Sequence, residues 1–314
     1  MESRKLSFDS KETHCSGLFY ESVNSNGSKA YDSRGRRSTV GCTSQACIVM
    51  AHGFAGIKEM RLQAYARRFC QAGYHVLMFD YRHFGESGGE PRQLLDIEKQ
   101  HEDWRAAIAY ARSIDGVDPN KIIIWGSSFS GGHVLKIAAE DKAIAAIISQ
   151  VPHFSGLASG LSGGILHAAQ LTVAGLFDQV GAICGLSPYY IDAIGLPGDL
   201  AVLNSEGEYQ GYMSLLPREH QYRNEVAARV CLHAVRYSPG KYLKKIVAPV
   251  LVQVGLNDKT TPAAATLRAC AYSTNKHVVT KKYNLGHFDV YVDPGFKVII
   301  NDQIAFLDRI FSAK

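Results

Sequence analysis

The sequence predicts an α/β protein built on a doubly wound, mostly parallel sheet, and three observations support that fold class. Short β-branched segments alternate with helical patterns over much of the chain. These strand segments are almost continuously apolar, as expected where helices cover both faces of a parallel sheet. The alternation stops once and later resumes. We therefore expect one core, residues 1–152 and 241–314, interrupted by an insertion at residues 153–240.

The first part of the core follows an irregular amino-terminal region with a polar turn at residues 24–37. Runs of apolar and β-branched residues predict strands, and amphipathic patterns between them predict helices. We expect strands at 18–23, 45–50, 74–80, 121–126 and 143–150, and helices ending near Gly73, at about 94–113 and at about 129–141.

The second part of the core begins with "APVLVQVG", a buried strand after the insertion. A helix from about Thr261 to Thr274, the strand "KHVVTKKY" and an amphipathic helix from about Phe296 to Phe311 complete it. The insertion itself has helical patterns broken by glycine and small residues. It is rich in Gly, Ala, Leu and aromatic residues, namely Phe154, Phe177, Tyr189, Tyr190, Tyr209 and Tyr212. Either a mobile lid over an apolar cavity or a purely structural helical cap would have this composition.

Composition indicates an ordinary globular protein, with 46% hydrophobic and 20% charged residues. No apolar run approaches the roughly 18 residues of a membrane span, so we expect no membrane association. The formal charge of +5 and a single basic cluster, Arg34, Arg36 and Arg37, argue against nucleic-acid binding. The seven cysteines form no CxxC pair and are odd in number, and the charged amino terminus has no apolar signal region. We therefore expect a cytoplasmic protein.

The segment "KIIIWGSSFSGG" takes a buried strand into a Gly-x-Ser-x-small turn and then into a helix. This context predicts a nucleophile elbow with Ser128 at its centre, because small residues two positions before and after it prevent collisions across the turn. Ser130 stands where glycine is usual, which is a small departure from the motif. A phosphate-binding loop would need GxxxxGK[ST], which this segment lacks.

A serine hydroxyl needs a base to remove its proton and an acid to orient that base. Asp258 follows the strand of "VLVQVGLNDKTTP", and His287 follows the last strand in "KKYNLGHFDV". We therefore predict Ser128, Asp258 and His287 as a catalytic triad. Asp289 is a rival acid, but it lies two residues from His287 and would have to fold back on its own loop.

Acyl chemistry also needs backbone N–H donors for an oxyanion. The loop "MAHGFAG" follows an early strand, so we predict the N–H groups of Phe54 and Phe129 as the pair, with Gly53 allowing close approach of the substrate. An ordinary strand-to-helix turn is the alternative. His52, His83 and His153 are predicted to line the site, whereas we expect His133, one turn into the elbow helix, to be packed in the core.

No HExxH motif or paired Cys/His spacing appears, so we expect no metal, and no cofactor is indicated. Dehalogenase or epoxide-hydrolase chemistry would need Asp at the elbow, and dienelactone-type chemistry would need Cys. The chain has Ser128 there.

Together these segments resemble the α/β-hydrolase superfamily: "AHGF", "FDYRHFGESGG", "GSSFSGG", "GLNDKTTP" and "NLGHFDVY" occur in its order. The resemblance covers residues 45–314 except the insertion, and implies that the insertion is a helical lid after the sixth strand. "DYRHFGESGG" and "VDPNKIIIWGSSFSGGHV" are similar to a branch whose fungal members are polyketide transferases or thiohydrolases of secondary metabolism. That resemblance implies an acyl or polyketide thioester as donor, with Ser128 carrying the acyl group.

Three functions are compatible with these residues. The first is hydrolysis of an ester or thioester through an acyl-enzyme, and the second is transfer of the same acyl group to an alcohol or amine. The third is a non-catalytic ligand receptor on a hydrolase scaffold. We expect a small-molecule ester, thioester or polyketide as substrate, with delivery by an acyl-carrier protein and oligomer formation both left open.

Overall fold

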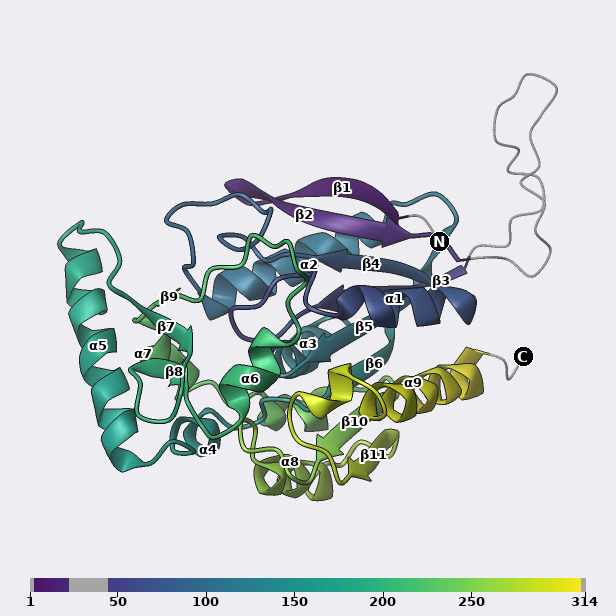
Figure 1. Cartoon of the computed structure of the whole chain (residues 1–314). Coiled ribbons are helices and arrows are strands. Elements are labelled where there is room, and N and C mark those ends of the chain that lie inside the picture. The colour runs from purple at the N-terminus through teal and green to yellow at the C-terminus, as the bar shows by residue number, and fades with distance from the viewer. Residues whose placement is uncertain (1–2, 23–44, 312–314) are drawn as a thin grey trace.

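The computed structural model describes residues 3–22 and 45–311 as one eight-stranded sheet with helices on both faces (Figure 1). The strand order is β1-β2-β4-β3-β5-β6-β10-β11. The six strands from β4 to β11 in this order are parallel, and β2 pairs antiparallel with both β1 and β4. The predicted fold class is therefore confirmed.

The strands of this sheet are β1 (Ser3–Ser10), β2 (Thr13–Tyr20), β3 (Gln45–Ala51), β4 (His75–Phe79), β5 (Val117–Ser127), β6 (Ile144–Gln150), β10 (Val250–Gly255) and β11 (Val278–Tyr283). The helices packed on it are α1 (Leu62–Gln71), α2 (Ile97–Arg112), α3 (Phe129–Glu140), α8 (Ala263–Ala271) and α9 (Gly295–Phe311), with a short 3-10 turn η2 (Asp289–Tyr291). Apart from β1, β2 and η2, these bounds agree with the expected elements to within a few residues.

The apolar strands fill two hydrophobic cores, one on each face of the sheet. In β5 the side chains alternate: Ile122 and Ile124 face the core under α2 and α3, and Ile123 and Trp125 face the core under α1 and α9. Burial of each such side chain contributes about 1.5–3 kcal/mol. This two-sided burial explains why the central strands have no polar alternation.

Two features of the amino-terminal region differ from the prediction. The strand expected at 18–23 begins earlier, as β2, and it is preceded by an edge strand β1 that the sequence analysis did not predict. β1 is mostly exposed and carries polar residues on one side, so it lacks the apolar run that marked the buried strands. The polar turn expected at 24–37 lies outside the described residues.

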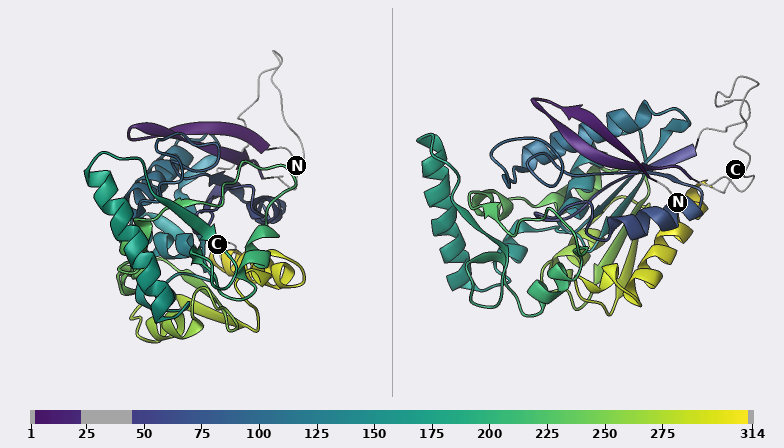
Figure 2. Two further views of the ribbon diagram at one scale, coloured as in Figure 1. Left: turned by 60° about the vertical axis from the view of Figure 1, so that its left-hand side comes forward. Right: turned by 45° about the horizontal axis from the view of Figure 1, so that its top comes forward.

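The insertion leaves the sheet after β6 and returns at β10, and it extends away from the core (Figure 2). It contains α4 (Gly156–Gly160), α5 (Ile165–Ile183), β7 (Tyr190–Ile194), β8 (Ala201–Leu203), α6 (Glu208–Met213), β9 (Val226–Ala227), α7 (Val230–Ala234) and the 3-10 helix η1 (Pro239–Lys245). The strands form a small separate sheet, β8-β7-β9. Helices were expected here, but this small sheet was not, because its strands are only two to five residues long.

Candidate active site

The turn between β5 and α3 holds Ser128 in a strained backbone conformation, with φ 57° and ψ −121°. Non-glycine residues rarely adopt positive φ, and such strain persists only where the surroundings enforce it. A Cβ on Gly126 would lie 2.2 Å from the carbonyl oxygen of Ser130, so only glycine fits there. The local sequence thus builds a sharp bend that presents Ser128 at the carboxyl end of the sheet.

The structure brings Ser128, His287 and Asp258 together from three separate loops. His287 Nε2 lies 2.9 Å from Ser128 Oγ, and His287 Nδ1 lies 2.7 Å from Asp258 Oδ2. A carboxylate can only accept, so Nδ1 carries the proton and Nε2 is free to accept from the serine hydroxyl. All three side chains are buried. A hydroxyl, an imidazole and a carboxylate in contact in this order can activate the hydroxyl as a nucleophile.

Thr261 holds Asp258, a role that the sequence analysis missed. Its backbone N–H donates to Asp258 Oδ1 at 2.7 Å, and its hydroxyl donates to Oδ2 at 2.8 Å. Asp258 and Thr261 are three residues apart just before α8, so these are local bonds of an Asp side chain within its own turn. The rival Asp289 instead accepts from the N–H of Gly286 at 2.7 Å, so it stabilises the loop that carries His287.

The loop after β3 meets the elbow at Gly53. A Cβ on Gly53 would lie 2.7 Å from Ser128 Cβ, so a side chain there would push the serine out of place. Within the described residues, the N–H groups of Phe54 and Phe129 have no protein acceptor, and the two rings pack edge-to-face at 5.7 Å. Two free N–H groups beside a serine can stabilise an oxyanion. The hydroxyl of Tyr212, in the insertion, donates to the carbonyl of Phe54 at 2.9 Å and anchors this loop.

A buried ion-pair network supports the same loop from behind. Lys58 Nζ lies 2.6 Å from Asp80 and 2.8 Å from Glu86, and the backbone N–H of Lys58 donates to Asp80 at 2.7 Å. Lys58 and Asp80 are fully buried. Asp80 and Glu86 belong to the segment after β4 whose sequence resembles the superfamily. By binding Lys58, this segment helps to hold the loop that contains Gly53. Removing one partner of the buried Lys58–Asp80 pair would be strongly destabilising.

The three histidines predicted on the site have different surroundings. His52 and His153 line cavities next to Ser128, and burial lowers the pKa of each to about 4. Both are therefore neutral near pH 7. His83 lines neither of these two cavities: its backbone is bonded to Gly88 and Gln93, and its ring lies beside Gly89 within its own loop. A role for His83 in substrate binding stays a prediction.

The remaining polar residues of the elbow are structural. Ser127 accepts from Tyr291 and from Gln150, and it is fully buried. Ser130 bonds the hydroxyl of Tyr81 at 2.6 Å, which explains why a serine replaces the usual glycine. His133 is buried and bonded to Gln100 at 2.9 Å, as expected for a packed residue.

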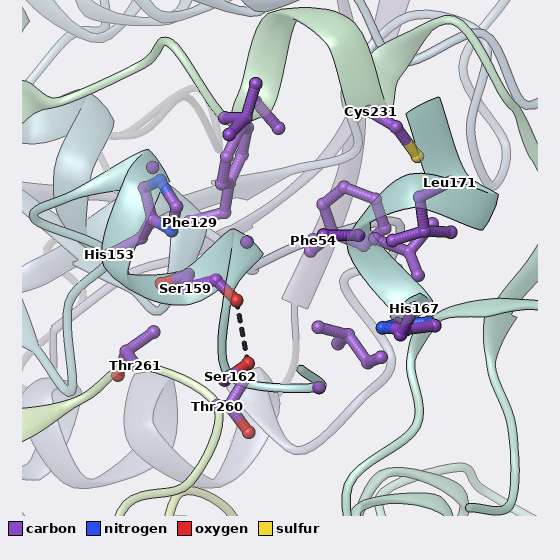
Figure 3. Close-up of a pocket in the computed structure, with 18 of the residues that line it drawn as sticks. Phe54, Phe129, His153, Ser159, Ser162, His167, Leu171, Cys231, Thr260 and Thr261 are labelled. Carbon is purple, nitrogen blue, oxygen red and sulfur yellow. Dashed lines mark hydrogen bonds between the residues drawn. The ribbon is translucent and has the colours of Figure 1, made fainter. Parts of the chain in front are cut away.

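Two cavities meet at Ser128. The larger one, about 220 Å³, lies between the core and the insertion (Figure 3). Its walls include His153, Leu171 of α5, Cys231 of α7 and Thr260. The smaller cavity, about 30 Å³, is lined by His287, Met60, Tyr212, Phe288 and Tyr291. Phe54 and Leu203 line both, so they separate the two spaces at the serine.

Glu208 gives the larger cavity a buried carboxylate that the sequence analysis did not identify. It accepts from the hydroxyl of Thr260 and from the N–H of Ser205. Most other walls from the insertion are apolar, such as Leu171, Val202 and Leu232. A cavity of this kind suits a ligand with an apolar chain and a few polar groups.

Within residues 3–22 and 45–311, no group of three or more His, Cys, Asp and Glu side chains is arranged to hold a metal ion. No helix in those ranges combines the length and the apolarity that crossing a bilayer requires.

Comparison with known proteins identifies the relatives. Residues 43–180 match the family model of serine aminopeptidase S33. The quorum-quenching protein AidA of Acinetobacter baumannii is 42% identical over 98% of this chain and 95% of its own length. A polyketide transferase of Stachybotrys chlorohalonatus is 27% identical over 84% of this chain and 88% of its own. A thiohydrolase of Aspergillus aculeatus is 42% identical over 37% of this chain and 36% of its own.

Solved structures agree on the fold. The α/β hydrolase GrgF from a Penicillium species superposes with a TM-score of 0.79 at 19% identity, covering 99% of this chain and all of that one. DcsB in complex with a substrate analogue gives a TM-score of 0.76 at 20% identity, covering 99% of this chain and all of that one. With a relative, AidA, at 42% identity over nearly the whole length of both chains and a core that matches in structure, the chain belongs to the α/β-hydrolase superfamily of enzymes, in the same family as AidA.

Proposed function

We propose that this enzyme hydrolyses a carboxylic ester or thioester through a covalent intermediate on Ser128. The observation that carries the proposal is the continuous contact from Ser128 Oγ to His287 and on to Asp258, at 2.9 and 2.7 Å. A hydroxyl on a strained elbow, in contact with a correctly oriented imidazole, is the usual activated serine.

The reaction then runs in two halves. Ser128 Oγ attacks the carbonyl carbon while His287 Nε2 takes its proton, and the oxyanion is bound by the N–H groups of Phe54 and Phe129. One such donor is worth about 2.7–4 kcal/mol in the transition state. His287 gives the proton to the leaving oxygen or sulfur as that bond breaks. Water then gives a proton to His287 as it attacks the acyl carbon, and His287 returns that proton to Ser128 Oγ as the bond to the acyl group breaks and the acid leaves.

The two cavities orient the substrate. The leaving group must receive its proton from His287, which lines the small cavity and not the large one. We therefore assign the acyl portion to the large cavity and the leaving group to the small one. A bulky acyl portion with a compact leaving group is the substrate shape that this division favours.

A lactone that carries an acyl-amide side chain has this shape. Its ring methylenes are compact and follow the leaving oxygen, while the side chain extends from the carbonyl side. The name of the relative AidA, a quorum-quenching protein, points to the removal of a bacterial signal molecule. N-acyl homoserine lactones are signal molecules of this chemistry, so we propose them as the first substrates to test.

The first experiment is intact-mass analysis after treatment with a fluorophosphonate, beside Ser128→Ala. One adduct on the parent and none on the variant is the expected result, because only an activated serine reacts. Both proteins are then given homoserine lactones with acyl chains of increasing length, and ring opening is followed by chromatography. An unlabelled parent would overturn the activated serine and favour a non-catalytic receptor. Labelling without lactone turnover would reject only the substrate.

Acyl transfer is the second candidate, because one relative is named as a polyketide transferase. The same Ser128 acyl-enzyme would then be resolved by an alcohol or amine. Acyl thioesters, free or attached to an acyl-carrier protein, separate the two functions. An adduct that water removes slowly and an added alcohol removes quickly would favour transfer, whereas rapid release in water would favour hydrolysis.

A further inference from the structure

The side of α5 that faces away from the core is strongly apolar. Seven large side chains, which we call the outer face, are between 52% and 83% exposed: Ile165, Leu166, Val173, Leu176, Phe177, Val180 and Ile183. In Figure 1 this helix stands at the left margin with no element beyond it, and both views of Figure 2 agree. The outer face is therefore open in the single chain.

The opposite side of α5 is anchored to the rest of the insertion. Leu171 and Ala174 are buried in the core cluster, and His167 Nε2 lies 2.8 Å from the carbonyl of Ala201. Asp178, also buried, accepts from the backbone and side chain of Arg229 at 2.7 to 2.9 Å. The helix is thus held in place by its inner side. On the outer face, Phe177 packs edge-to-face on Tyr189 at 5.1 Å, and it still remains 67% exposed.

The spacing of the outer face is that of a coiled-coil seam. Apolar residues recur alternately four and three residues apart at the six positions Leu166, Ala169, Val173, Leu176, Val180 and Ile183. This is a heptad repeat of a and d positions over about two and a half heptads. β-Branched residues occupy two of the a positions, Val173 and Val180, and Leu176 occupies a d position. A binding partner that is a β-sheet or an extended peptide would not require this 3.5-residue period, whereas a partner helix would.

The exposed apolar area is too large for an ordinary monomer. From the exposed fractions, the outer face amounts to on the order of 900 Å², against roughly 300–600 Å² for the largest apolar patch of a typical monomer. A standard interface buries about 800 Å² on each partner. The area of this face is therefore in the range that a stable dimer needs.

The charges around α5 indicate which kind of partner can cover the outer face. No Lys or Arg occurs between Lys142 and Arg218, so this stretch offers no cations to an anionic lipid surface or an acidic carrier protein. The one charged residue within α5, Asp178, is neutralised by Arg229. An uncharged apolar seam is complementary to another of the same kind.

We propose that the outer face of α5 packs antiparallel against α5 of a second copy of this chain. In that arrangement each a position meets a d position: Leu166 meets Ile183, Ala169 meets Val180, and Val173 meets Leu176. The pairing is self-complementary, as a two-fold interface requires, and it sets the helix dipoles in opposite directions. Leu171 and Thr172 on the same helix line the large cavity, so the interface also supports one cavity wall.

The test is the molar mass in solution, measured by light scattering and sedimentation at micromolar concentration. We expect a dimer for the parent and a monomer for the double variant Val173→Glu with Leu176→Glu, which places charges in the seam. The matched control is Tyr272→Glu, because Tyr272 is 83% exposed at the end of α8, away from α5. The control should stay dimeric, and circular dichroism should show all three folded.

Other results would overturn the proposal. A monomeric parent, or a double variant that stays dimeric, excludes α5 as the dimer interface. A monomeric parent that binds neutral phosphatidylcholine vesicles, with binding lost in the double variant, would assign the outer face to a lipid surface.

The orientation is tested with cysteines in a Cys184→Ser background, since Cys184 is an exposed native thiol beside the seam. Leu166→Cys with Ile183→Cys should give a disulfide-linked dimer, because those positions meet only when the helices are antiparallel. The two are too far apart along one helix, about 25 Å at 1.5 Å per residue, to link within a chain. Leu166→Cys alone should remain unlinked, and linkage of that single variant would replace the antiparallel arrangement with a parallel one.

Discussion

Two regions build the candidate active site, and they contribute different kinds of residue. The loops at the carboxyl ends of the core strands contribute buried polar groups, and the inserted segment contributes mainly apolar cavity walls. Ser128, Asp258 and His287 are buried, and each is held by backbone geometry or by hydrogen bonds within the core. The insertion contributes mainly apolar cavity walls, and its longest helix exposes an apolar face to the outside. The groups proposed for the chemistry thus belong to the core, and many of the side chains that line the large cavity belong to the insertion.

This difference shows how one scaffold can serve several reactions. The contacts of the proposed triad depend on short loops after parallel strands, which every relative with this fold can build. The cavity walls depend on a segment that has its own small sheet and is joined to the core by side-chain contacts, such as the bond from Tyr212 to Phe54. Substitutions in the two regions should therefore affect different kinetic parameters.

The largest effect is expected at the acid of the proposed triad. Asp258→Asn should lower kcat by roughly 10³–10⁴-fold with little change in KM, because the amide no longer selects the imidazole tautomer that accepts from Ser128. The matched control is Asp289→Asn, which removes the rival carboxylate from the same site. Steady-state kinetics with the best ester substrate checks both, and an equal loss in the control would contradict the assignment of Asp258.

The next effect concerns a glycine at the point of closest approach. Gly53→Ala should lower kcat by about 10²-fold, since its Cβ would lie 2.7 Å from Ser128 Cβ and displace the nucleophile. Gly181→Ala is the control in the insertion, where the added Cβ has no neighbour closer than 3.8 Å. It should leave kcat unchanged and leave thermal stability equal or slightly higher. Normal activity in Gly53→Ala would show that the elbow is less crowded than the structure indicates.

A smaller effect is expected in the cavity wall. Leu171→Trp fills part of the large cavity and should lower kcat/KM for long acyl chains by about 10–100-fold while sparing short ones. Leu176→Trp, on the outer face of the same helix, should not change this chain-length preference. The two variants are compared across a series of acyl lengths. A loss that is the same for all lengths in Leu171→Trp would mean that the acyl chain lies elsewhere.

The smallest effect is on stability as a function of pH. Burial lowers the pKa of His153 to about 4, below the 6.5 of an unfolded histidine, so the unfolded state binds more protons between these values. The free energy of unfolding should therefore fall as the pH is lowered from 6.5 toward 4, with His153 contributing about 1–2 kcal/mol by pH 5. Urea unfolding at pH 7, 6 and 5 should show a shallower fall in His153→Gln than in the parent.

His277→Gln, which changes an exposed histidine, is the control for that series. An unchanged pH dependence in His153→Gln would mean that burial does not lower the pKa of His153 in the folded protein.

Most of the central fold and the three residues of the proposed triad could be predicted, because their signals are local. A strand, a Gly-x-Ser-x-small turn and a helix are encoded by adjacent residues, and the ends of parallel strands must meet at one edge of the sheet. Thr261 could also have been found, since it lies three residues from Asp258. The edge strand β1 and the small sheet of the insertion were missed because short or polar strands carry little apolar pattern.

What the sequence determined by itself was the order of the elements, the bend at Ser128 and the acid and base that follow later strands. Only the tertiary structure decided that His83 lines neither of the two cavities, that Tyr212 and Glu208 reach the site, and that one side of α5 is left open. The physical reason is the separation along the chain of the residues that determine each property. Backbone conformation depends on neighbouring residues, whereas the surroundings of a side chain depend on packing between segments that are distant in the chain.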